Sequence, residues 1–100
     1  MKKLVFRIRK EYFDAIVEGT KRIEYRKDSQ FWGARIRGFD RIDNSQEYMA
    51  VFICGKRTHR REIVAIERMK TPDYFSEQGN LDVDTPTCLA FHLGKIILIP

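Results

Sequence analysis

The chain has 100 residues, of which 43% are hydrophobic, and this size predicts one domain over residues 1–100 that buries its own core. The longest uncharged apolar runs, 49–55 and 96–100, are too short for a membrane-spanning helix, and no signal-peptide hydrophobic stretch follows Lys3. We therefore expect no membrane partner and a cytosolic or nuclear protein, with the cytoplasm as the predicted location.

Charge is unevenly distributed along the chain. Lys and Arg number 19 against 14 Asp and Glu, which gives a net charge of +5 at pH 7. Residues 1–70 carry 18 basic and 10 acidic side chains (+8), whereas residues 71–100 carry 1 and 4 (−3). A basic segment of this kind favours a polyanion as partner and makes nucleic acid a candidate.

The chain begins with a predicted strand, a helix and a second strand. Residues 4–9 alternate apolar and polar side chains, as half-buried strands do. Residues 10–18 repeat their apolar side chains at helical spacing, which predicts an amphipathic helix that ends at Gly19. Residues 21–27 alternate again, with the charged side chains on one face, so we expect Tyr25 on the other face to point inward.

The remaining elements are one short helix and several strands. The pattern predicts a short helix that Asp28 or Ser29 can cap, that contains Trp32 and that ends at Gly38. It then predicts, in order, a loop over 38–48, a strand over 48–54, a basic hairpin connection over 55–61, a strand over 61–70, a turn or short helix over 71–75, a polar loop over 78–85, a strand over 87–93, a turn at 94–95 and a strand over 96–99.

These elements together indicate the fold class. Within the strand over 61–70, simple alternation places Ile63 and Ala65 on one face and Val64 and Ile66 on the other. Several connections are too short to hold a crossover helix, so a parallel α/β sheet is disfavoured. Five or six strands with one to three short helices predict an α+β fold built on a small mixed β-barrel.

Three charged residues around the second strand form a candidate site. Glu24 and Arg26 lie two positions apart on one strand face, where a carboxylate and a guanidinium can orient each other, and Lys21 lies where the strand begins. Such a group could bind a phosphate or the polar edge of a base, and a desolvated Lys beside a Glu could act as an acid or a nucleophile. The same residues could instead be a solvated strand face whose ion pair contributes about 0–1 kcal/mol.

The segment 15–26 resembles the signature of ASCH domains, a branch of the PUA-like superfamily. That signature is a helix ending in Gly, followed by Gly-x-Lys-x-x-Glu-x-Arg running into a strand, and this chain matches it at Gly19, Lys21, Glu24 and Arg26. The likeness extends to Trp32 and Arg35, to residues 52–55 and to residues 91–94. The resemblance implies a PUA-like β-barrel with a cleft and a connection to nucleic acids or nucleosides.

We therefore expect a domain that binds RNA or a modified nucleoside in a cleft edged by Lys21, Glu24 and Arg26. Phosphate contacts are expected from Arg35, Lys56 and Arg57, because guanidinium and ammonium groups neutralise phosphates. The basic connection that contains Lys56 and Arg57 could equally be a solvated hairpin tip.

A small hydrolase is the alternative. Some ASCH relatives are amidohydrolases that act on acylated cytidine and one branch cleaves RNA, and for an enzyme of this kind Lys21 and Glu24 would be the catalytic residues. The amidohydrolase type has a Thr where this chain has Glu24, and a hydroxyl and a carboxylate cannot fill the same nucleophilic role. A third possibility is a protein-interaction module, for which the sequence offers no specific sign.

We expect no cofactor and no metal. Cys54 and Cys88 lie in apolar segments, where cysteines are usually free core residues. They lack metal-ligand spacing with each other or with the two histidines. His92 is interpreted as a structural imidazole within a strand and His59 as an exposed loop residue.

Overall fold

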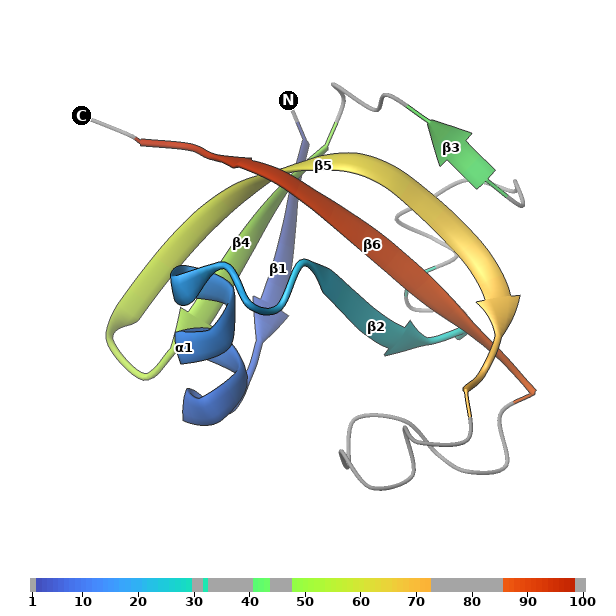
Figure 1. Ribbon diagram of the computed structural model, residues 1–100, viewed down its shortest axis with the longest axis horizontal. Coiled ribbons are helices and arrows are strands. Elements are labelled where there is room, and N and C mark those ends of the chain that lie inside the picture. The colour runs from blue at the N-terminus through green and yellow to red at the C-terminus, as the bar shows by residue number, and fades with distance from the viewer. Residues whose placement is uncertain (1, 30–31, 33–40, 44–47, 73–85, 99–100) are drawn as a thin grey trace.

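The structure is a computed structural model that describes residues 2–29, 32, 41–43, 48–72 and 86–98 (Figure 1). Its elements in chain order are β1 (Lys2–Arg7), α1 (Lys10–Glu18), β2 (Ile23–Lys27), β3 (Arg41–Asp43), β4 (Tyr48–Cys54), β5 (Arg57–Lys70) and β6 (Thr87–Ile96). No helix in these ranges has the length and apolar composition needed to cross a bilayer.

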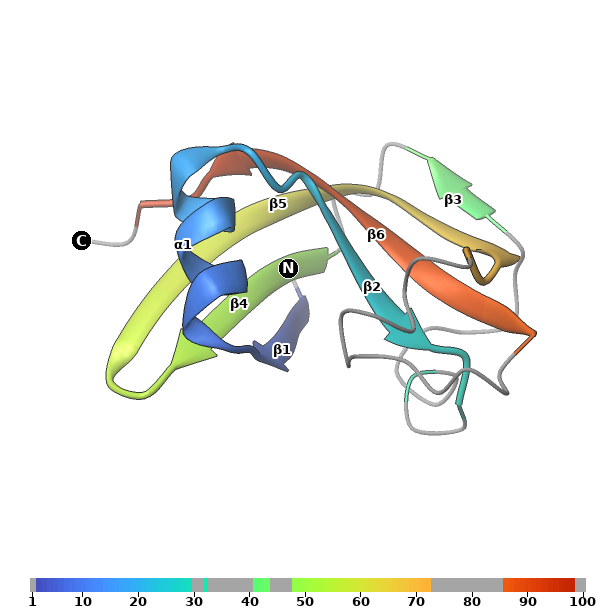
Figure 2. The same cartoon turned by 60° about the horizontal axis from the view of Figure 1, so that its bottom comes forward.

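All six described strands belong to one mixed sheet. Five of them follow the order β1-β4-β5-β6-β2, and β3 pairs with β5 outside this path. β1 runs parallel to β4, whereas the other pairings are antiparallel. The sheet curls into a half-barrel with α1 packed at one end (Figures 1 and 2). The α+β fold around a small mixed barrel, predicted from the sequence, is thereby confirmed.

The end of α1 determines where β2 starts. α1 buries Phe13 and Ile16 against the sheet, as its amphipathic pattern predicts. Gly19 then adopts a φ of 88°, which is a left-handed conformation. Glycine adopts it at little energetic cost because it has no Cβ. The backbone N–H groups of Gly19 and Lys21 both donate to the carbonyl of Ala15, at 3.1 and 3.0 Å. This tight turn fixes the position of Lys21 at the entrance to β2.

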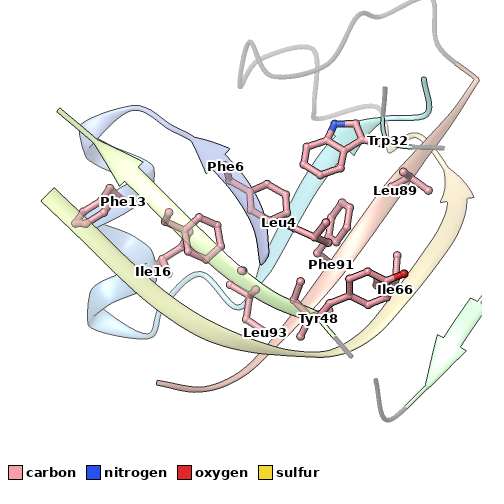
Figure 3. Packing of buried hydrophobic residues seen from close by; sticks show 13 residues of the cluster. Leu4, Phe6, Phe13, Ile16, Trp32, Tyr48, Ile66, Leu89, Phe91 and Leu93 are labelled. Carbon is pink, nitrogen blue, oxygen red and sulfur yellow. The ribbon is translucent and has the colours of Figure 1, made fainter. Parts of the chain in front are cut away.

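Aromatic rings dominate the core on the concave side of the sheet. Phe6 stacks on Trp32 and on Phe52, with ring centroids 4.9 and 5.2 Å apart, and meets Phe91 edge-on at 5.0 Å. Side chains from α1 enter the same core at the end opposite Trp32 (Figure 3). Each buried ring contributes about 1.5–3 kcal/mol by leaving water, and aromatic pairing adds about 0.5–1.5 kcal/mol. Phe6 therefore joins β1 to three other segments of the fold.

The charged face of β2 points toward this core, which contradicts the expectation for Tyr25. Glu24 lies opposite Phe91 in the β2–β6 register, and both side chains are buried. Tyr25 is on the other face of β2, where it packs with Met69 against Cys88 in a second, smaller cluster. Alternation identified the two faces correctly, but the assumption that charge faces solvent assigned the wrong one to the core.

β5 begins earlier than the sequence pattern indicates. It follows a two-residue turn of Gly55 and Lys56, so residues 57–61, expected in a basic connection, pair with β4 as strand residues. Gly55 has a φ of 60°, the conformation that favours glycine in such short turns. His59, expected in an exposed loop, is half-buried on β5 opposite Phe52.

An irregularity in β5 explains why simple alternation fails there. The register with β6 shifts on both sides of Ile63. Ile63, Ala65 and Ile66 are consequently all buried, whereas Val64 is exposed. A β-bulge of this kind changes which face a side chain occupies, and no local pattern in the sequence announces it.

Other parts of the chain also differ from expectation. β6 continues through Gly94 and Lys95, where a turn was predicted, and ends at Ile96, so the described part of the separate strand expected over 96–99 contributes only Ile96 to a strand. β3 lies within the segment 38–48, which was predicted to be a loop. The helix expected after Ser29 and the turn expected over 71–75 lie mostly outside the described residues, although Trp32 is described and buried.

Candidate functional site

The structure brings Lys21, Glu24 and Arg26 together. Lys21 Nζ lies 3.6 Å from Glu24 Oε1, and Arg26 Nη2 lies 3.5 Å from Glu24 Oε2. The carboxylate therefore lies between two cations. Lys21 is in the turn after α1, and Arg26 is the next inward-facing residue of β2 after Glu24. We refer to these three residues as the Glu24 site.

Glu24 is the one charged side chain that is fully buried among the described residues, with 1% of it exposed. Burying a carboxylate is costly unless opposite charges and hydrogen bonds compensate for the lost water. Oε1 accepts a hydrogen bond from the backbone N–H of Tyr25 at 3.1 Å. Oε2 accepts none from any residue that the structure describes, although native structures satisfy most buried polar atoms.

Arg26 connects the two edges of the half-barrel. From the edge strand β2, its Nη2 donates a hydrogen bond to the backbone carbonyl of Arg7 at the end of β1, at 3.2 Å. Its guanidinium also lies 5.2 Å from the centroid of the Phe6 ring, a cation–π distance. Arg26 Nε is buried without a hydrogen-bond partner among the described residues. The Glu24 site thus contains one acceptor and one donor that make no hydrogen bond to a described residue.

Lys21 is held by backbone and aromatic contacts. Its Nζ donates to the carbonyl of Ile23 at 2.8 Å and lies 5.8 and 5.7 Å from the ring centroids of Tyr12 and Tyr25. The Lys21 side chain is 14% exposed and that of Arg26 is 23% exposed. The site therefore reaches solvent through its cations, whereas the carboxylate is shielded.

The other residues predicted to bind nucleic acid lie elsewhere. Lys56 and Arg57 are at the β4–β5 turn, where Arg57 Nη1 pairs with Asp14 Oδ1 at 2.9 Å and the guanidinium lies 4.4 Å from the Phe13 ring centroid. Hydrogen bonds from Lys10 and Arg57 lower the pKa of Asp14. These contacts of Arg57 are made with α1 and not with Lys21, Glu24 or Arg26. Arg35 lies outside the described residues.

A pocket that sequence reasoning missed lies at the shared end of β1 and β4. Its volume is about 450 Å³, and it is lined by Arg7, Ile8, Arg9, Ile53 and Gly55. These residues come from segments more than 40 positions apart in the sequence. The only signal that could have indicated it is the pair of arginines that ends the first apolar run.

The histidines and cysteines do not assemble a metal site in the ranges that the structure describes. His59 packs edge-on against Phe13, with ring centroids 6.3 Å apart, and burial together with the charge of Arg61 lowers its pKa. Burial raises the pKa of the Cys88 thiol, so this buried cysteine is protonated near neutral pH.

Comparison with known proteins identifies the family. The ASCH domain family model matches residues 6–72, which run from Phe6 in β1 through the Glu24 site to two residues beyond the end of β5. No curated protein and no solved structure matches the chain. Because the match covers well over half of the sequence and includes the whole Gly19–Arg26 motif, the chain belongs to the ASCH domain family, which is generally linked to RNA binding.

Proposed function

We propose that this ASCH domain binds single-stranded RNA and holds the polar edge of one base at the Glu24 site. The observation that carries the proposal is that Glu24 Oε2 and Arg26 Nε are both buried and that neither makes a hydrogen bond to a described residue, although Oε2 lies 3.5 Å from Arg26 Nη2. An unpaired base displays an N–H donor beside an acceptor, which complements both atoms. In a duplex these edges are already paired, so a single strand is the expected form.

The carboxylate favours a base over a phosphate as the group bound there. A phosphate placed beside Glu24 would meet a buried like charge, which opposes binding. A base edge is neutral and can donate to the carboxylate, while Lys21 and Arg26 compensate the charge of Glu24. Phosphates are therefore proposed to bind at other basic side chains.

Access to Glu24 requires a movement of one of the two cations. Lys21 and Arg26 are the exposed parts of the site, and the base would displace the end of one of these long side chains. Reordering one such side chain costs about 2 kcal/mol or less in conformational entropy, which two charge-assisted hydrogen bonds can offset. Arg35, Lys56 and Arg57 are proposed to contact phosphates, which supplies affinity that does not depend on sequence.

Binding of an eight-nucleotide single-stranded RNA, followed by fluorescence anisotropy, tests the proposal. Glu24→Gln keeps the shape of the side chain but removes its charge, and we expect it to weaken binding about tenfold or more. Glu18→Gln, an exposed substitution at the end of α1, is the matched control and should bind like the wild type. Circular dichroism and thermal unfolding show whether each variant is folded.

Two further arms identify the kind of ligand. One offers an RNA duplex and the other offers free nucleosides. Equal affinity of wild type and Glu24→Gln for the single strand, or a preference of the wild type for duplex, would contradict the proposal. Tight binding of a nucleoside with no gain from the RNA strand would make the nucleoside the ligand instead.

A further inference from the structure

The pocket at the shared end of β1 and β4 is lined by two isoleucines, two arginines and Gly55. The ends of these strands lie side by side (Figure 2), with Arg7 opposite Ile53 in the register. The backbone N–H of Ile8 donates to the carbonyl of Ile53 at 3.1 Å, which extends the pairing beyond β1. Ile8 also packs against the main core, so its position does not depend on a ligand. Arg7 and Arg9, which also line the pocket, are exposed residues.

Arg7 belongs to both the pocket and the surroundings of the Glu24 site. Arg7 lines the pocket, and its backbone carbonyl accepts the hydrogen bond from Arg26 Nη2 at 3.2 Å. On the other side, Gly55 lines the pocket and opens the β4–β5 turn, whose next residues are Lys56 and Arg57. The pocket therefore shares Arg7 with the surroundings of the Glu24 site and Gly55 with the basic turn.

The chemistry of the pocket differs from that of the Glu24 site. Arg7 and Arg9 supply two guanidinium groups, and the residues lining the pocket include no carboxylate. Guanidinium groups bind phosphates through paired hydrogen bonds, and the apolar surface of Ile8 and Ile53 suits a sugar or a base ring. A volume of about 450 Å³ lies within the usual range for small-ligand pockets. The pocket is thus suited to an anionic nucleotide, whereas the Glu24 site is suited to a neutral base edge.

We infer that this pocket is a second subsite, which holds the phosphate and sugar of the nucleotide next to the base bound at Glu24. This inference rests on the proposed function, because it takes the Glu24 site as the base subsite. It makes the ligand an oligonucleotide of at least two nucleotides and not a free nucleoside. The strand would continue past Gly55 toward Lys56 and Arg57.

A length series of single-stranded RNA tests the second subsite. The ligands are a nucleoside, a dinucleotide and an eight-nucleotide strand, and the variants are Arg7→Gln and Arg9→Gln. The matched control is Lys95→Gln, which removes the same charge from an exposed position on β6. In the order of the sheet, β5 separates β6 from β4, and β1 lies beyond β4. The backbone carbonyl that Arg26 uses is retained in Arg7→Gln, so the Glu24 site keeps this contact.

We expect the wild type to bind the dinucleotide at least about tenfold more tightly than the nucleoside, and we expect either arginine substitution to remove most of that gain. Each lost phosphate contact should also reduce the slope of log K against log salt by about 0.7. The control should retain both the affinity and the slope.

The other outcomes separate the two proposals. If Arg7→Gln and Arg9→Gln bind the strands as the wild type does, while Glu24→Gln weakens binding, the second subsite is wrong and the proposed function stands. If all charge substitutions weaken binding equally, Lys95→Gln included, the pocket has no specific role and the subsite is again wrong. If the wild type binds only the nucleoside, or binds none of the ligands, RNA binding fails and the second subsite fails with it.

Discussion

Arg26 on β2 donates a hydrogen bond to the backbone carbonyl of Arg7 on β1, and this bond links the first and last strands in the order of the sheet. The pairings between described residues include no backbone ladder between these strands. The same guanidinium lies over the Phe6 ring and 3.5 Å from Glu24 Oε2. Arg26 therefore contributes to closing the half-barrel and to compensating the buried carboxylate.

The first prediction concerns this double role. Arg26→Lys keeps the positive charge but loses the planar group that contacts Arg7, Phe6 and Glu24 together. We expect the free energy of unfolding, measured by urea denaturation, to fall by about 1–2 kcal/mol. Arg22→Lys, at an exposed position of the same segment, should change it by less than about 0.5 kcal/mol. Equal stability of the two variants would show that the link between β1 and β2 carries no energy.

A second prediction follows from His59. Burial, and the nearby charge of Arg61, lower its pKa from the usual 6.5, so the folded state favours the neutral imidazole. Above pH 6.5 the group is mostly neutral in both states and costs no stability. As the pH falls below 6.5, the unfolded chain takes up a proton first, and stability is lost until the pH passes the folded-state pKa.

The measurement is thermal unfolding between pH 7.5 and pH 5 for the wild type and His59→Gln. The variant should lose less stability than the wild type over this range, because it lacks the titrating ring. Carboxylates contribute equally to both proteins, so the difference between the two curves isolates His59. Parallel curves would rule out this explanation of the pH dependence.

Sequence patterns predicted those features that depend on neighbouring residues. The apolar run of β4 and the helix that ends at Gly19 have the predicted bounds, because burial of a continuous strand and a left-handed helix end leave local signals. The grouping of Lys21, Glu24 and Arg26 also follows from two local facts, the turn after α1 and the alternation along β2.

Features that depend on distant parts of the chain could not be predicted in this way. Alternation cannot tell which face of β2 is buried, since Glu24 is accommodated there by Lys21 and by Arg26, and Arg26 is itself held by its contacts with β1. The pocket beside Arg7 and Ile53 exists because two strand ends meet in space. The bulge at Ile63 depends on the pairing between β5 and β6 and has no counterpart in the hydrophobic pattern.

A third prediction explains why Gly94 occurs inside a strand. A Cβ at position 94 would lie 2.6 Å from Val64 Cγ1 and 3.2 Å from Glu62 Oε2, so Gly94→Ala forces neighbouring atoms to move. We expect it to lower the free energy of unfolding by about 1–3 kcal/mol.

A double-mutant cycle tests this cause directly. Val64 is 39% exposed, so Val64→Ala alone should cost little. In the double variant the clash with Val64 disappears. Its loss in free energy of unfolding should therefore be about 1 kcal/mol smaller than the sum of the losses in the two single variants. Strict additivity would place the cost of Gly94→Ala elsewhere, for example in the backbone.

The last prediction addresses catalysis at Lys21. A lysine can lose its proton in a partly buried site and act as a nucleophile or base, whereas a guanidinium effectively cannot. If the domain only binds RNA, Lys21→Arg preserves the charge beside Glu24, and the affinity for a single strand should change by no more than about threefold. Neither the wild type nor the variant should then deacylate an acylated cytidine or cleave the RNA, because Glu24 occupies the position where the amidohydrolase pattern has a hydroxyl.

Purified wild type, Lys21→Arg and the exposed control Lys95→Arg are incubated with each substrate, and the products are separated by chromatography. Turnover by the wild type and by Lys95→Arg that is lost in Lys21→Arg would make the domain a hydrolase with Lys21 in its mechanism, and turnover that is equal in all three would place the chemistry at another residue.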